Sequence, residues 1–292
     1  MGIQRPSEMG EAAPGPGYTA TLAAVGRAVH AESERPLVVD HLALGLAGDA
    51  GAALMAQMTS QLPEASRQSF GLAFAIRTRF VEDAVEAAIQ DGIGQYVILG
   101  AGLDSFAYRR LDLSERLKIF EVDRAASQAW KRRRLEEMGV AIPHSVAFVP
   151  FDVEKEEDLG AALVKAGFDP SRPAIVSAIA LTQYLAQPAI ERILELVASF
   201  AAGSRLVVTY VVPAGELSEM AAAGLAWTMS QAEERGERFL SLFRPVEFDE
   251  LLRRRGFSRV EEVGSRELIQ TYLAERPDGQ LTGIERLATA WV

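Results

Sequence analysis

The stretch that decides the fold is QYVILGAGLDSFAYRR, residues 95–110. An apolar run over 96–99 breaks into a turn between Gly100 and Gly102, and an acid, Asp104, follows. Because glycine has no side chain, such a turn lets a ligand approach the backbone closely, and a following helix offers free N–H groups. The stretch therefore predicts a buried strand, a glycine turn and a ligand site at the carboxyl end of that strand.

Short apolar runs alternate with helical patterns on the C-terminal side of this stretch. Such alternation predicts an α/β fold with a doubly wound, mostly parallel, Rossmann-like sheet. Strands are expected at 96–99, 118–122, 146–151, 174–179 and 205–212, and residues 287–292 form a candidate last strand.

The remaining segments are expected to be helical or flexible. Residues 18–91 contain no clear strand, and apolar residues recur at helical spacing in 72–90, which predicts an N-terminal helical layer. Residues 214–240 interrupt the strand alternation, as a helical lid would. The expected organisation is a flexible tail (1–17) and a single domain (18–292), divided into a helical cap (18–91) and a Rossmann-like core (92–292) that carries the lid.

Composition excludes several classes of partner. The formal net charge of −10 opposes binding to nucleic acid, and we interpret the basic run at 131–134 as the solvated face of a helix. The chain has no cysteine, which excludes disulfides and cysteine-based metal sites, and its three histidines lack the spacing of metal ligands. We therefore expect neither a nucleic-acid partner nor a metal.

No apolar run reaches the roughly 18 residues of a membrane span, so we expect no membrane partner. The first residues lack the apolar segment of a signal peptide. From both observations we expect a cytoplasmic protein.

Acids also end the next two predicted strands. Glu121 and Asp123 end the second, about twenty residues after Gly100, where an acid accepts hydrogen bonds from an adenosine ribose. Asp152 follows the third, where an acid could accept from the adenine amine. A pyrophosphate would prefer basic or neutral surroundings, so these acids favour a cationic adenosine ligand without phosphates. S-adenosylmethionine, with its sulfonium and ammonium, has these properties.

A nicotinamide cofactor is the alternative that a Gly-x-Gly turn raises. The dinucleotide fingerprint has a third glycine three positions after the second, and here that position is Ser105. A nicotinamide-dependent dehydrogenase is therefore the less favoured hypothesis.

With these features, the chain resembles the class I S-adenosylmethionine-dependent methyltransferases related to the leucine carboxyl methyltransferases. This group includes many bacterial proteins of unassigned substrate and O-methyltransferases of polyketide pathways. The resemblance extends from about residue 18 to the C-terminus. The similar stretches are IRTRFVEDAVEAAIQDGIGQYVILGAGLDSFAYRR (76–110), FEVDRAASQAWKRRRL (120–135), FVPFDVEKEEDL (148–159), LTQYLAQPAI (181–190) and FLSLFRPVEFDELLRRRGF (239–257).

The resemblance implies roles for individual residues. The turn at Gly100 and Gly102 would pack against the methionine part of the cofactor. Asp123 would hold the ribose, with Glu121 as the second candidate, and the pair that follows the third strand, Asp152 and Val153, would flank the adenine.

The resemblance also assigns Arg77 to the carboxylate of the cofactor, a role that suits the planar fork of a guanidinium. The alternative for Arg77 is an ion pair with Asp83 or another helix acid. The related carboxyl methyltransferases have a glutamate five residues before the tyrosine that corresponds to Tyr184, and here that position is Ile179. The cofactor's ammonium would then rely on backbone carbonyls or on another acid.

The expected function is O-methylation of a small-molecule hydroxyl or carboxylate. Thr182 and Tyr184 are candidates for contact with this acceptor, and neither is assigned a catalytic role. A carboxylate is ionised at neutral pH and needs no base, whereas an alcohol or phenol needs one. Because of Ile179, a cofactor-binding relative without turnover is the alternative. The sequence indicates neither the acceptor nor the oligomeric state.

Overall fold

A computed structural model describes residues 15–113, 116–155, 157–275 and 281–292. The flexible tail expected over 1–17 lies outside these residues, apart from its last three positions. No helix within the described ranges has both the length and the apolar character to cross a membrane.

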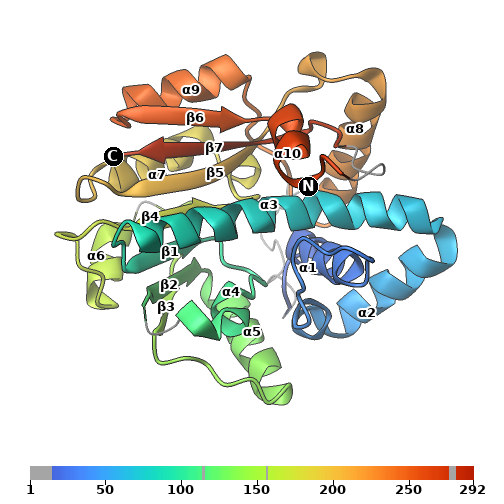
Figure 1. The fold of residues 1–292 in the computed structure, drawn as a ribbon, viewed down its shortest axis with the longest axis horizontal. Coiled ribbons are helices and arrows are strands. Elements are labelled where there is room, and N and C mark those ends of the chain that lie inside the picture. The colour runs from blue at the N-terminus through green and yellow to red at the C-terminus, as the bar shows by residue number, and fades with distance from the viewer. Residues whose placement is uncertain (1–14, 114–115, 156, 276–280) are drawn as a thin grey trace, which may run out of the picture.

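Within the described residues, seven strands form one sheet in the order β3-β2-β1-β4-β5-β7-β6 (Figure 1). They are β1 (Gln95–Leu99), β2 (Lys118–Asp123), β3 (Val146–Pro150), β4 (Ile175–Ala178), β5 (Arg205–Val211), β6 (Arg259–Val263) and β7 (Glu285–Trp291). Strands β1 to β5 are parallel, and β7 is antiparallel to β5 and β6. The strand order reverses between β1 and β4, which is where ligands bind in open α/β sheets. The predicted doubly wound, mostly parallel, Rossmann-like sheet is confirmed.

Helices cover both faces of this sheet. They are α1 (Tyr18–Ala31), α2 (Ala43–Gln61), α3 (Glu64–Gln90), α4 (Phe106–Arg109), α5 (Ala125–Glu137), α6 (Leu159–Lys165), α7 (Gln187–Ala198), α8 (Glu219–Glu233), α9 (Pro245–Arg254) and α10 (Ser265–Tyr272). Val97 and Leu99 of β1 join an apolar cluster with α6, α7 and α9, whereas Tyr96 and Ile98 join a second cluster with α1 to α5. Because side chains alternate along a strand, β1 contributes to both layers of the core.

Three helices precede the sheet, in the region expected to form a helical layer. Helix α3 lies across the sheet, and α1 and α2 lie beside one end of it (Figure 1). Helices α1 and α3 pack closely, since a Cβ added to Gly71 would lie 2.9 Å from the carbonyl oxygen of Gly26. This packing places the first turn of α1 and the middle of α3 against the carboxyl ends of the strands.

The edge strand and the helix after the glycine turn differ from the sequence-based expectation. The edge strand β6 is absent from the expected set, because its residues RVEEV are charged and partly exposed and lack an apolar run. The helix that follows the glycine turn, α4, has only four residues. The site after β1 is therefore built more from loop backbone than from a helix N-terminus.

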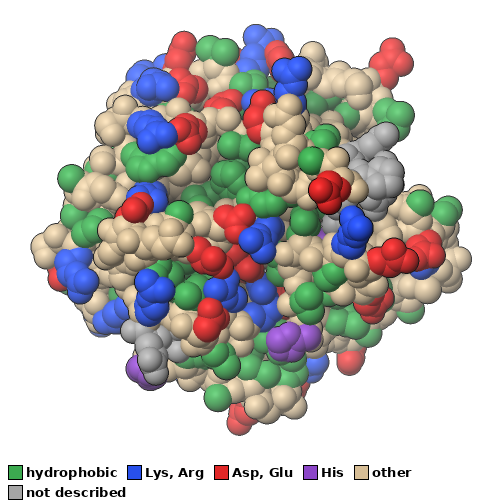
Figure 2. All heavy atoms as spheres, viewed as in Figure 1, with side chains coloured by type: hydrophobic (Ala, Val, Ile, Leu, Met, Phe, Trp, Pro, Cys, Tyr) green, Lys and Arg blue, Asp and Glu red, His purple; other side chains and the backbone are tan. Residues whose placement is uncertain are grey.

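The interpretation of residues 131–134 as a solvated face is wrong for Lys131. Its side chain is 1% exposed, and its Nζ lies 2.8 Å from Oε2 of Glu121 on β2. Helix α5 places this lysine against the sheet while Arg132 and Arg133 remain exposed. Figure 2 shows acidic and basic side chains interspersed on the face that it draws.

Candidate active site

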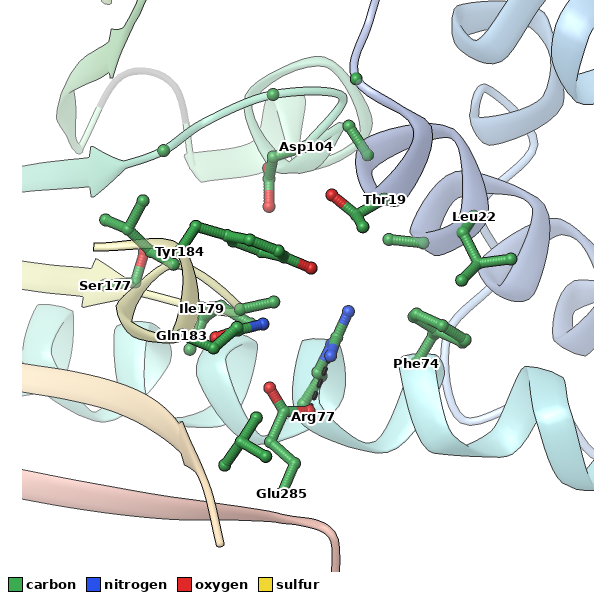
Figure 3. Close-up of a pocket in the computed structure, with 18 of the residues that line it drawn as sticks. Thr19, Leu22, Phe74, Arg77, Asp104, Ser177, Ile179, Gln183, Tyr184 and Glu285 are labelled. Carbon is green, nitrogen blue, oxygen red and sulfur yellow. Dashed lines mark hydrogen bonds and ion pairs between the residues drawn. The ribbon is translucent and has the colours of Figure 1, made fainter. Parts of the chain in front are cut away.

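A cavity of about 780 Å³ opens at the carboxyl ends of the parallel strands. Its walls come from the segments after β1 to β5, from α1 and α3, and from residues 236–240 and 281–285 (Figure 3). The structure brings most of the predicted site residues into this lining: Arg77, Gly100, Gly102, Asp104, Asp123, Asp152, Val153 and Tyr184. Glu121 and Thr182 are not part of it.

The glycine turn forms one side of the cavity. Gly100 has a φ of +66°, and a Cβ there would lie 3.0 Å from the Cδ1 of Leu181. Its N–H donates to the carbonyl of Val122 at 2.9 Å, and the N–H of Gly102 donates to Oδ2 of Asp123 at 2.6 Å. The turn is therefore fixed to the end of β2, and a side chain at Gly100 would require strained backbone and displacement of Leu181.

Asp123 and Glu121 differ in their surroundings. Asp123 lines the cavity, and its two oxygens accept backbone hydrogen bonds from Gly102 and Arg124. The fully buried carboxylate of Glu121 instead pairs with Lys131, and burial raises its pKa. Of the two candidates for the ribose, only Asp123 is placed where it could meet a ligand in this cavity.

Thr182 and Tyr184 differ in the same way. The Thr182 hydroxyl donates to the carbonyl of Thr209 at 2.9 Å and is buried. Tyr184 extends into the cavity with its hydroxyl directed towards Thr19, and its ring packs edge-on against Phe239 (Figure 3). Burial raises the pKa of Tyr184, although hydrogen bonds with Thr19 and Gln183 lower it in part, so the phenol is protonated at neutral pH.

Arg77 projects from α3 into the cavity and pairs with an acid that is distant in the sequence. Its Nη1 lies 2.6 Å from Oε2 of Glu285, at the start of β7. The partner considered from the sequence, Asp83, is paired instead with Arg79 at 2.8 Å. The guanidinium and the carboxylate lie side by side in the cavity wall (Figure 3).

Ile179 lines the cavity just beyond β4. It packs in a cluster that includes Ile76 and Leu287. The next residue, Ala180, has a φ of +51°, which is unfavourable for a residue with a Cβ, and its N–H donates to the hydroxyl of Thr209 at 2.7 Å. The backbone after β4 is thus held in a strained turn at the cavity wall.

A family model described as leucine carboxyl methyltransferase matches residues 20–198, more than half of the chain. The chain belongs to this methyltransferase family. Its cofactor is S-adenosyl-L-methionine, which the names of its relatives specify. The less favoured hypothesis, a nicotinamide-dependent dehydrogenase, is therefore wrong.

Two relatives illustrate the similarity. A protein of Frankia alni, whose assigned name is that of an S-adenosyl-L-methionine-dependent methyltransferase, is 37% identical over 196 residues, covering 65% of this chain and 67% of its own. A protein of Mycobacterium marinum with the same assigned name is 34% identical over 203 residues, covering 65% of this chain and 62% of its own. The matched region thus spans about two thirds of the length of these relatives.

Solved structures support the fold. A protein of Thermobifida fusca assigned as a methyltransferase matches with a TM-score of 0.62 and 18% identity over 96% of each chain. A DUF574 family protein of Streptomyces avermitilis matches with a TM-score of 0.59 and 15% identity over 94% of this chain and 97% of its own. At these identities the likeness concerns the fold alone.

The residues of this methyltransferase fit the cofactor. Three carboxylates, those of Asp104, Asp123 and Asp152, line the cavity at the ends of neighbouring strands, as suits a cationic ligand that carries no phosphate. Both glycines of the turn, Gly100 and Gly102, line the same cavity. At the other side, Oε1 of Glu285 is buried without a hydrogen-bond partner among the described residues. Glu285, which lines the cavity, therefore has one oxygen with no protein donor from the ranges that the structure describes.

Several lining residues of the methyltransferase were not found from its sequence. Gln183 directly precedes Tyr184 in the motif LTQYLAQPAI, and this motif is the signal that could have identified it as a lining residue. Thr19, Glu237 and Glu285 come from segments without a recognisable motif. The backbone N–H and the hydroxyl of Thr19 donate to Oε2 of Glu237 at 2.9 and 2.5 Å, which joins the start of α1 to the segment after α8.

Proposed function

We propose that this protein transfers the methyl group of S-adenosylmethionine to a hydroxyl or carboxylate oxygen of a small molecule. The observation that carries this proposal is the composition of the cavity. Its acidic end adjoins a wall with several aromatic side chains, those of Phe70, Phe74, Trp227 and Phe239. Such a wall suits an acceptor with an apolar body, and the family's named reaction takes place at a carboxyl oxygen.

Each part of the cavity has a proposed role. Asp123 would accept hydrogen bonds from the ribose hydroxyls, and Asp152 with Val153 would flank the adenine. The Gly100 turn would pack against the methionine part, near Asp104, and Arg77 would hold the carboxylate. Placement in one lining supports these roles.

Bound cofactor would supply an activated methyl group on a sulfonium, so the protein's task is alignment and exclusion of water. The aromatic wall would orient the acceptor and keep water out. Because its phenol is protonated at neutral pH, Tyr184 would donate a hydrogen bond to an acceptor oxygen rather than act as a base. A carboxylate acceptor would need no further group.

Mass spectrometry of a cell extract incubated with the purified protein and methyl-deuterated S-adenosylmethionine tests the proposal. We expect a small molecule to gain one labelled methyl group, and we expect the Asp123→Ala variant to yield far less. Binding of S-adenosylhomocysteine without any labelled product would instead favour the relative without turnover. The cytoplasmic location remains a prediction from the sequence, which cell fractionation would test.

A further inference from the structure

Arg77 and Glu285 form a largely buried ion pair in the cavity wall. Their side chains are only 13% and 22% exposed, and they come from α3 and β7, which are far apart in the sequence. Oε2 of Glu285 accepts from Arg77, while Oε1 is buried with no hydrogen-bond partner in the described part of the chain. A buried acceptor without a partner costs free energy, which Glu285 would recover if its side chain turned this oxygen towards a donor in the cavity that it lines.

The pair borders the carboxyl ends of β1 and β4. Ile179, just after β4, packs with Leu287, two positions after Glu285 on β7, and with Ile76, which precedes Arg77. Residues Leu99 and Ala178 are register partners at the ends of β1 and β4, so this corner adjoins the Gly100 turn. Figure 3 shows Ile179, Arg77 and Glu285 in one part of the cavity.

The charges of this pair match a zwitterion. A free amino-acid group presents a carboxylate and an ammonium on one carbon, and S-adenosylmethionine ends in such a group. A guanidinium has five N–H donors in a fork, so Arg77 could hold a ligand carboxylate without releasing Glu285. With its side chain turned towards the cavity, Glu285 would present its second oxygen to the ammonium, whereas Ile179 offers this corner no charge.

We propose that Glu285 receives the ammonium of the cofactor's amino-acid end beside Arg77, so that the two residues form a zwitterion clamp. The clamp rests on the proposed function, because it takes the role of Arg77 from it. The competing account is that the ion pair only ties α3 to β7. The two accounts predict different effects of a Glu285 substitution on the affinity for ligands with an amino-acid group and for ligands without one.

Calorimetry on a Glu285→Gln variant separates them. Glutamine keeps the size and an acceptor for Arg77 but removes the charge that an ammonium requires. We expect affinity for S-adenosylhomocysteine to fall about 10- to 100-fold, the worth of a hydrogen bond between charged groups. Affinity for 5′-methylthioadenosine, which lacks the amino-acid group, should not change.

A matched control is Glu262→Gln. Glu262 is a partly buried carboxylate on β6, paired with Arg286 at 3.4 Å, and it does not line the cavity. Both ligands should bind this variant as they bind the unchanged protein. Thermal unfolding of each variant without ligand measures what each carboxylate contributes to stability, which for Glu262 includes the hydrogen bond that it accepts from the Tyr210 hydroxyl at 2.6 Å.

An unchanged affinity of Glu285→Gln for S-adenosylhomocysteine, or an equal loss for both ligands, would overturn the clamp. If that variant fails to fold, the unchanged protein is tested with a desamino analogue of S-adenosylhomocysteine. Weaker binding of this analogue supports the clamp, and equal binding overturns it. Failure of the unchanged protein to bind S-adenosylhomocysteine at all would count against the proposed function instead.

Discussion

At the scale of single residues, two carboxylates on β2 have different surroundings although the sequence presents them alike. Glu121 and Asp123 are two positions apart, so they face the same side of the sheet. They differ in depth. Glu121 lies beneath α5 and pairs with Lys131, whereas Asp123 ends the strand at the cavity. The spacing of acids along a strand could not distinguish them, because depth is set by where α5 crosses the sheet.

Asp123→Ala should weaken binding of S-adenosylhomocysteine by about 1.5–3 kcal/mol, the worth of hydrogen bonds to a charged acceptor. The fold should survive, since Asp123 stands at a strand end and is partly exposed. Calorimetry measures the affinity, and circular dichroism checks the fold. Unchanged binding would remove Asp123 from the proposed ribose site.

Glu121→Gln should act on stability instead. The substitution leaves the ammonium of Lys131 buried without its counter-charge, which costs about 3–5 kcal/mol when a buried pair is broken. Denaturant unfolding should show this loss, while the folded variant binds S-adenosylhomocysteine with normal affinity. A variant of normal stability and weak binding would reverse the assignment of the two carboxylates.

At the scale of elements, the segment expected as a lid contains α8. Only Ala221, Leu225 and Ala232 of this helix are buried, and Trp227, which lines the cavity, is 62% exposed. The segment is joined to α1 by the hydrogen bonds between Thr19 and Glu237 and by Arg235, whose guanidinium lies 4.2 Å from the ring centre of Tyr18. Sparse burial and a polar connection are the properties of an element that opens locally.

We therefore predict that residues 214–240 exchange amide hydrogens quickly without ligand and slowly when cofactor and acceptor are both bound. Helix α7, with five buried side chains among its residues, is the internal control and should be protected in both states. Hydrogen exchange followed by mass spectrometry measures both segments at once. Equal and strong protection of 214–240 in the two states would end the lid hypothesis.

The sequence predicted those elements whose pattern is set locally. Strands β1 to β5 were found because each contains a short apolar run, and the glycine turn was found because Gly100 and Gly102 directly follow the first of these runs. The edge strand β6 was missed because its charged residues have no such run. Glu285 was missed because its meeting with Arg77 depends on the antiparallel return of β7, and no local pattern encodes that contact.

At the scale of the whole molecule, a buried ionic network joins the N-terminal helices to the loop that carries Asp104. Asp40, after α1, pairs with Arg27 of α1 at 2.8 Å and lies 3.6 Å from Arg109 of α4, which also pairs with Glu82 of α3. Arg27 also donates to the carbonyl of Leu103 at 2.7 Å. The network thus fixes the position of these N-terminal helices relative to the loop after β1.

The pKa of Asp40 shows that this network favours its charged form. Burial alone would raise that pKa, but the charges of Arg27 and Arg109 and the hydrogen bond from Ser105 together lower it below its ordinary value of 3.8. A carboxyl group with a lowered pKa stabilises the fold at every pH above its ordinary value. This stabilisation is lost as the pH falls through the lowered pKa. Burial raises the pKa of Glu82, which belongs to the same network. Because Glu82 is present both in the unchanged protein and in an Asp40 variant, its own titration is common to the two proteins that are compared.

Asp40→Asn should therefore destabilise the protein at neutral pH by about 3–5 kcal/mol, because Arg27 is left buried without its counter-charge. The difference from the unchanged protein should shrink as the pH falls below about 3.8, where Asp40 of the unfolded chain takes up a proton, and should vanish once the pH has fallen through the lowered pKa of the folded protein. Urea unfolding of both proteins at neutral and acid pH measures this difference in stability.

The control is Asp112→Asn, which removes an ion pair that Arg110 makes with an exposed carboxylate and should cost less than about 1 kcal/mol. A stability difference for Asp40→Asn that stays constant across this pH range would show that the network acts through packing and not through the charge of Asp40.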